Sequence, residues 1–134
     1  MRLAVAYLTI LIVFGLIDAV WLSVMASALY YPLLGDLLVD EIRIAPAVVF
    51  YLFYPVGIVV FAVRPALREV SMLSAALLGA LYGALCYATY DLTNYATLKN
   101  WSLQVTVIDI IYGALTASIC AAAAYATASW YQRR

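Results

Sequence analysis

Apolar residues run in four long blocks along the chain, and polar residues gather in the short links between them. Each block reaches the roughly 20 residues that a helix needs to cross the hydrocarbon core of a bilayer. A helix is required there because an isolated strand leaves its backbone polar groups unsatisfied in lipid. We therefore predict an all-α, polytopic membrane protein: a four-transmembrane-helix bundle in a single domain, 1–134, with helices over about 3–26, 44–63, 71–92 and 103–128.

Two of the links shape the predicted bundle. Arg64 and Pro65 are expected to end the second helix, so the short link over 65–69 makes the second and third helices an antiparallel hairpin. The link over 29–43 is longer, and its leucines recur at helical spacing opposite Asp36 and Asp40. We interpret it as a short amphipathic outer connector that lies on the membrane surface. The alternative is an extension of the first helix beyond the membrane.

The composition limits the kinds of binding and catalysis that the chain can perform. With 69% apolar and 10% charged residues, the chain cannot cover a water-exposed globule. Basic and acidic residues number seven each, so no charge excess favours a nucleic-acid partner. Histidine is absent, and Cys86 and Cys120 form no CxxC motif, so we expect no metal site and no cofactor. Carboxylate, tyrosine, amide and hydroxyl chemistry remains.

The basic residues predict an orientation. Positive charge is enriched in the cytoplasmic loops of membrane proteins. With the N-terminus inside, five basic residues lie on the cytoplasmic side and only Arg43 and Lys99 lie outside. The five are Arg2, Arg64, Arg68, Arg133 and Arg134. We therefore expect a multi-pass protein with both termini in the cytoplasm.

Three aspartates interrupt the apolar blocks, where an ionisable side chain costs roughly 2.5–3.5 kcal/mol. At 1.5 Å per residue, Asp18 and Asp109 lie about 8–9 Å below the outer boundary and Asp91 lies near that boundary. Aromatic and amide side chains share their helix faces or lie at a similar depth on the second helix. We predict an outward-facing ligand or proton site built from Asp18, Asp91, Asp109, Tyr51, Tyr54, Tyr87, Tyr112, Asn94 and Trp21.

We expect Asp18 and Asp109 to face one another and to share a proton, because two carboxylates in a medium of low dielectric constant do not both ionise cheaply. Asp91 is expected to matter less, since Lys99 or Arg43 can neutralise it. The alternative is structural: intramembrane aspartates and tyrosines also bond across helices and fix their packing.

Small residues predict where helices approach closely. Gly79 and Gly83 form a GxxxG pair, and Gly113 and Ala117 continue a ladder of small residues in the fourth block. Such faces let two backbones touch, either within one chain or between subunits of a homodimer or larger membrane complex.

The motifs resemble those of a known family. Asp18-x-x-Trp21-Leu22, the run from Tyr87 to Trp101 with its Tyr-Asp-Leu-Thr-Asn core, and Asp109-Ile-Ile-Tyr112-Gly113 are similar to a bacterial family of predicted membrane proteins, domain of unknown function 2177 (DUF2177). The resemblance covers essentially the whole chain. It departs at Tyr112, where the family tends to carry Trp, and at Ser102, where it tends to carry Pro. It implies a four-helix protein of the bacterial inner membrane and brings no activity with it.

Three functions stay open at this point. The first is binding or transport of a small lipid-soluble or cationic ligand, with the aspartates as proton or cation sites. The second is a non-catalytic subunit of a larger membrane assembly. The third is a lipid-modifying enzyme with Asp109 or Asp18 as general base and a tyrosine as acid. No nucleophile motif supports the enzyme.

Overall fold

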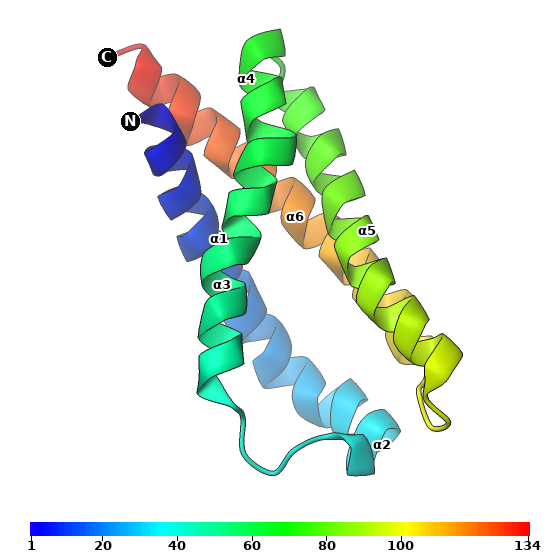
Figure 1. Cartoon of the computed structure of the whole chain (residues 1–134). Coiled ribbons are helices and arrows are strands. Elements are labelled where there is room, and N and C mark those ends of the chain that lie inside the picture. Colours follow the sequence, from blue (N-terminus) through cyan, green and yellow to red (C-terminus); the bar gives the residue numbers. More distant parts are fainter.

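The computed structural model describes all 134 residues, and its regular elements are all helical. Four spans are long and apolar enough to cross a membrane: Arg2–Leu37, Ile44–Glu69, Met72–Thr97 and Leu103–Gln132. Figure 1 shows them as one bundle, with both termini at the end that also holds the turn between the second and third spans. The predicted all-α membrane bundle is confirmed.

The first span is a single bent helix. α1 (Arg2–Met25) continues into a π-turn, η1 (Ala26–Tyr30), then into α2 (Tyr31–Leu34) and a 3-10 turn, η2 (Gly35–Leu37). The N–H of Tyr31 bonds to the carbonyl of Ala26, five residues back, which is the π-helical pattern. The helical part of the connector is therefore an extension of the first helix, and residues 38–43 form the loop to the second span.

The second span runs past the predicted end at residue 63. It consists of α3 (Ile44–Ile58), a second π-turn, η3 (Val59–Val63), and α4 (Arg64–Glu69). Pro65 lies in the first turn of α4, where a proline is tolerated because an N–H at this position has no acceptor within the helix. In the π-turn before it, the Arg64 N–H donates to the carbonyl oxygen of Val59, five residues back, so the chain stays helical up to the proline. The prediction that Arg64 and Pro65 end this helix was therefore wrong.

The hairpin to the third span turns at two residues. Val70 adopts the left-handed conformation with φ 54°, and the Ser71 hydroxyl then accepts the N–H of Ser74 at 3.1 Å. This cap starts α5 (Met72–Thr97), which runs five residues beyond the predicted boundary at 92. The fourth span, α6 (Leu103–Gln132), is capped in the same way by Ser102 and also exceeds its prediction.

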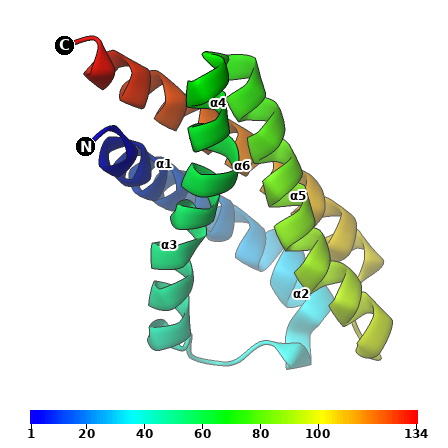
Figure 2. The same cartoon turned by 45° about the horizontal axis from the view of Figure 1, so that its top comes forward.

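Helices α5 and α6 lie side by side in both views (Figures 1 and 2). Their backbones touch at the small residues: a Cβ on Gly83 would overlap the carbonyl oxygen of Gly113. A Cβ on Gly79 would lie 2.6 Å from the carbonyl oxygen of Ala117. The GxxxG face is therefore used within one chain.

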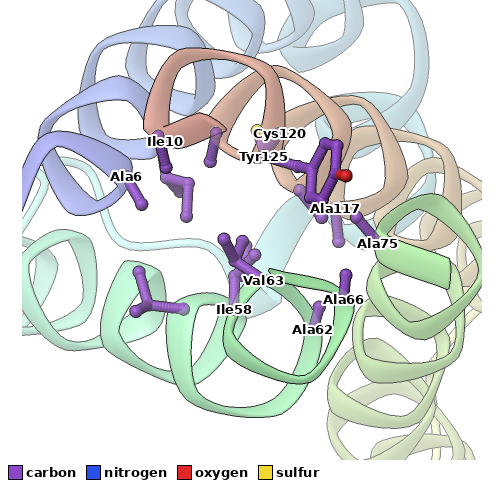
Figure 3. Close-up of a cluster of buried hydrophobic side chains, with 14 of the residues drawn as sticks. Ala6, Ile10, Ile58, Ala62, Val63, Ala66, Ala75, Ala117, Cys120 and Tyr125 are labelled. Carbon is purple, nitrogen blue, oxygen red and sulfur yellow. The ribbon is translucent and has the colours of Figure 1, made fainter. Parts of the chain in front are cut away.

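The main apolar core lies in the half of the bundle that holds the termini. Figure 3 shows side chains of α1, of the second span and of α6 that point towards one another, among them Ile10, Val63 and Cys120. The outer faces are apolar as well, with Leu77, Leu81 and Leu85 exposed along α5 in an i, i+4 stripe. A helix that is apolar on both faces suits lipid as its surroundings. The other half of the bundle has only a small core, around Leu29, Leu34 and Val105.

Candidate functional site

Asp18 ties three helices together. The residue lies on α1 and is only 8% exposed. Its carboxylate accepts hydrogen bonds from the Tyr51 hydroxyl of α3 and from the Tyr112 hydroxyl of α6, the latter at 2.8 Å. Asp18 lies one helical turn after Phe14 on the same buried face, so the face that packs the core also presents the carboxylate. Two phenol donors compensate its burial, and the contact is a cross-brace of the bundle.

Asp109 has a different set of partners. The Tyr30 hydroxyl donates to it at 2.5 Å, and the indole Nε1 of Trp21 donates to the Tyr30 oxygen at 2.9 Å. Tyr30 is the last residue of the π-turn η1, which carries its ring from the end of the first span across to α6. The sequence analysis did not predict this contact.

Asp91 is the least satisfied polar group of the chain. Its side chain is completely buried on α5, and neither carboxylate oxygen has a hydrogen-bond partner. Its nearest charged neighbour is the Asp109 carboxyl, which lies beside it across the α5–α6 contact. Lys99 lies exposed beyond the end of α5 and does not neutralise Asp91. Two neighbouring carboxyl groups that are buried without a cation repel one another when both are ionised.

The paired carboxyls are therefore Asp91 and Asp109, and the expected pairing of Asp18 with Asp109 was wrong. Asp18 and Asp109 bind separate tyrosines. The physical reason is the tight α5–α6 contact, where small residues bring the two backbones together and carry Asp91 against Asp109. Asp91 has a more central place than the sequence suggested.

Three of the predicted tyrosines, one each from α3, α5 and α6, pack against one another. The ring of Tyr87 meets Tyr54 edge-on at 6.4 Å between centroids and meets Tyr112 edge-on at 6.0 Å. Gly113 makes room for it, since a Cβ there would overlap the Tyr87 ring. The buried hydroxyl of Tyr54 has no hydrogen-bond partner. Tyr54 and Tyr87 also line a small pocket of about 250 Å³ between α3 and α5.

A pocket of about 540 Å³ lies at the end of the bundle away from the termini. Ten of its twelve lining residues are hydrophobic, and the other two are Ser23 and Asp109. The walls come from the first span, the 38–43 loop, α5, the link before α6 and α6 itself. The lining residues are Leu22, Ser23, Ala26, Tyr30, Tyr31, Leu34, Leu38, Val39, Ile42, Tyr90, Trp101 and Asp109.

Of the predicted site residues, only Asp109 lines this pocket. Trp21 does not line the pocket, but its indole donates a hydrogen bond to the lining residue Tyr30. Asn94 lies half-buried one turn beyond Tyr90 on α5. Sequence reasoning missed Tyr90 and Trp101 as wall residues. Their rings meet edge-on at 5.6 Å, and the Trp101 indole donates to the Thr106 hydroxyl at 3.0 Å. Tyr90 and Trp101 both belong to the Tyr87–Trp101 motif that carries the family resemblance. That motif was the one sequence feature that could have identified them.

The arrangement favours a particular ligand chemistry. A mostly apolar pocket with one carboxylate suits a lipophilic molecule that carries a positive charge or a hydrogen-bond donor. No group of three or more histidine, cysteine, aspartate or glutamate side chains is gathered that could hold a metal ion.

Comparison with known proteins gives one finding. The family model described as Predicted membrane protein (DUF2177) matches residues 3–126, nearly the whole chain. No curated protein and no solved structure matches.

Proposed function

The chain belongs to the DUF2177 family of predicted membrane proteins, and within that frame we propose that it binds a small lipid-soluble cation in the pocket that Asp109 lines. The bound cation takes the place of a proton that Asp91 and Asp109 hold between them. The observation that carries this proposal is the unpartnered, fully buried carboxyl of Asp91 beside the one charged side chain of an apolar pocket.

The energetics of burial support an exchange. Each unpaired ion buried in a protein costs several kcal/mol, so the Asp91–Asp109 pair is stable only when a positive charge accompanies it. In the empty site that charge is a proton. A cation that reaches Asp109 from the pocket supplies the same compensation, and the proton can then leave. Ligand binding and proton release are linked for this reason.

The shape and lining of the pocket support a lipophilic ligand. Its volume of about 540 Å³ lies within the range of small-molecule sites, roughly 300–1,000 Å³. The aromatic faces of Tyr90 and Trp101 can attract a cation before it meets the carboxylate. Asp109 itself is fixed by the Tyr30 hydroxyl, so the charge has a defined position.

The alternative of a subunit contact through the glycine face receives no support. Gly79, Gly83, Gly113 and Ala117 lie against one another where α5 crosses α6, so this face is covered within the chain. A partner would have to use another surface.

A binding titration tests the function. Purified protein in detergent is titrated with tetraphenylphosphonium, a lipophilic cation, and tryptophan fluorescence reports binding near Trp101. We expect Asp109→Asn to lose most of the affinity and Asp36→Asn, an exposed aspartate in η2, to keep it. In a weakly buffered solution, wild-type binding should release protons. Undiminished binding by Asp109→Asn would overturn the proposal.

A second pair of variants tests the pocket without touching its charge. Ala26 lines the pocket, whereas Ala28 in the same π-turn is exposed and does not. Ala26→Phe should fill the pocket and weaken binding, and Ala28→Phe should leave it unchanged. Equal binding by both variants would place the cation elsewhere.

We also propose that the pocket faces outward and that both termini are cytoplasmic in a bacterial inner membrane. The support is the count of basic residues: five arginines at the end with the termini, against Arg43 and Lys99 at the pocket end. Reporter fusions after Arg134 and within the 38–43 loop should report opposite sides. A C-terminal reporter outside the cytoplasm would overturn the orientation.

A further inference from the structure

A second, polar pocket lies at the opposite end of the bundle, between the start of α1, the end of α4 and the end of α6. Its volume is about 320 Å³, and no acidic residue lines it. The lining consists of Arg2, Leu67, Val70, Tyr125, Ser129, Gln132 and Arg133. We propose that this pocket binds the phosphate of an anionic phospholipid headgroup.

The two arginines are placed to hold an anion. The guanidinium of Arg2 donates to the neutral side-chain oxygen of Gln132 at 2.7 Å, which fixes its direction without neutralising its charge. Arg133 follows directly as the C-cap residue of α6. Guanidinium groups bind phosphate oxygens through pairs of parallel hydrogen bonds, so two of them around one cavity match a phosphate. Ser129 adds a hydroxyl to the same wall.

The charge around the pocket is mostly positive. This end of the bundle carries five arginines and a single glutamate, Glu69. Two helices begin here and two end here, so the helix dipoles largely cancel and the arginines set the potential. Glu69 also accepts a hydrogen bond from the Ser74 hydroxyl at 2.6 Å, on the α4–α5 side.

The position favours a lipid over a free anion. The pocket opens where four spanning helices meet the membrane surface, and basic pockets at this level bind anionic headgroups. One wall is apolar: Leu67 and Val70 line it, and Val70 is 77% exposed. Next to it, Met72 and Leu73 expose apolar side chains at the start of α5, where acyl chains can lie. Trp130 directly follows the lining residue Ser129, and the Arg134 guanidinium lies over its ring at 3.8 Å, an arrangement suited to the interface.

The test is a titration of short-chain phosphatidylglycerol into the detergent-solubilised protein, with phosphatidylcholine of the same chain length as the zwitterionic control. Tryptophan fluorescence follows binding because Trp130 lies close by. We expect phosphatidylglycerol to bind and phosphatidylcholine not to. The double variant Arg2→Gln/Arg133→Gln should weaken binding by more than about tenfold, because it removes the charge-assisted hydrogen bonds to the phosphate.

The matched control removes the same charge from the same end. Arg64 and Arg68 are exposed and do not line the pocket, so Arg64→Gln/Arg68→Gln should bind nearly as tightly as the wild type. If both doubles lose affinity equally, surface charge alone attracts the lipid and the pocket proposal is wrong. If inorganic phosphate competes as strongly as the lipid, the site is one for free anions and the lipid assignment is wrong.

Two further measurements keep the proposal testable if the arginine double does not fold. Ser129→Leu keeps every charge but narrows the pocket, and it should weaken phosphatidylglycerol binding. Mass spectrometry of wild-type protein after detergent washing should find phosphatidylglycerol or another anionic phospholipid retained over zwitterionic lipid. Retention of lipids in their bulk membrane proportions would contradict the proposal. None of these outcomes depends on the cation pocket at the other end.

Discussion

Trp21 stacks on Tyr112, with ring centroids 4.1 Å apart and ring planes inclined by 16°. Tyr112 donates to Asp18, while Trp21 donates to Tyr30, which in turn donates to Asp109. The stacked pair therefore connects two carboxylate sites that share no hydrogen-bond partner. One of these sites braces the bundle, and the other reaches the pocket.

Substitutions at Trp21 should separate the contribution of the ring stack to stability from that of the hydrogen bond. Trp21→Phe keeps an aromatic ring against Tyr112 but removes the donor to Tyr30, and we expect it to lower the free energy of unfolding by about 0.5 kcal/mol. Trp21→Leu also removes the stack and should cost about 1–2 kcal/mol. Unfolding in mixed micelles, followed by circular dichroism, measures both. Equal losses would show that the stack contributes nothing.

The brace at Asp18 should affect stability more than ligand binding. Asp18→Asn and Tyr112→Phe each remove part of the same contact, so each should lower stability by about 0.5–1.7 kcal/mol. The double variant should cost less than the sum, because the two changes remove one shared interaction. Tyr131→Phe, exposed at the end of α6, is the control and should be neutral. Additive losses would argue against a direct bond.

The spans could be predicted from the sequence because lipid imposes a simple rule on it. A chain in hydrocarbon must satisfy every backbone group internally, so an apolar block of sufficient length becomes a helix. All four spans followed that rule. Their ends were less well predicted, since Pro65 stays within a helix once the π-turn at Val59–Val63 precedes it.

The partners of the aspartates could not be predicted in the same way. Spacing arguments assume a regular α-helix, and the π-turn at Ala26–Tyr30 adds one residue to a turn. Each added residue rotates the following side chains by about 100° around the helix axis. Tyr30 therefore reaches Asp109 from a segment that was interpreted as a surface connector. The depth argument placed all three aspartates towards the outer side, but depth does not say which two helices touch.

The α5–α6 contact should not tolerate a side chain at Gly83. A Cβ there would overlap a backbone oxygen of Gly113 and lie 2.6 Å from the Ala117 side chain, so the helices must separate. We expect Gly83→Ala to lower the free energy of unfolding by about 1–3 kcal/mol. Gly15→Ala is the matched control, because nothing lies within 4 Å of the position of its Cβ. A thermal unfolding series in detergent compares the two, and similar midpoints would contradict the close contact.

Asp91→Asn should separate the proton of the carboxyl pair from the rest of the site. The amide that replaces the carboxyl has nearly the same shape and can donate an N–H to Asp109, which substitutes for the shared proton at the same net charge. We therefore expect the free energy of unfolding to stay equal or to rise by up to about 1 kcal/mol, whereas Asp18→Asn lowers it.

In the wild type, cation binding should weaken as the pH falls, because protons compete for the pair. In Asp91→Asn, this pH dependence should be lost while the pocket still binds. Tetraphenylphosphonium titrations across a pH series, with Asp40→Asn as the exposed control, measure the effect. If Asp91→Asn instead destabilises the protein as much as Asp18→Asn and leaves the pH dependence unchanged, Asp91 is a structural residue and the exchange mechanism is wrong.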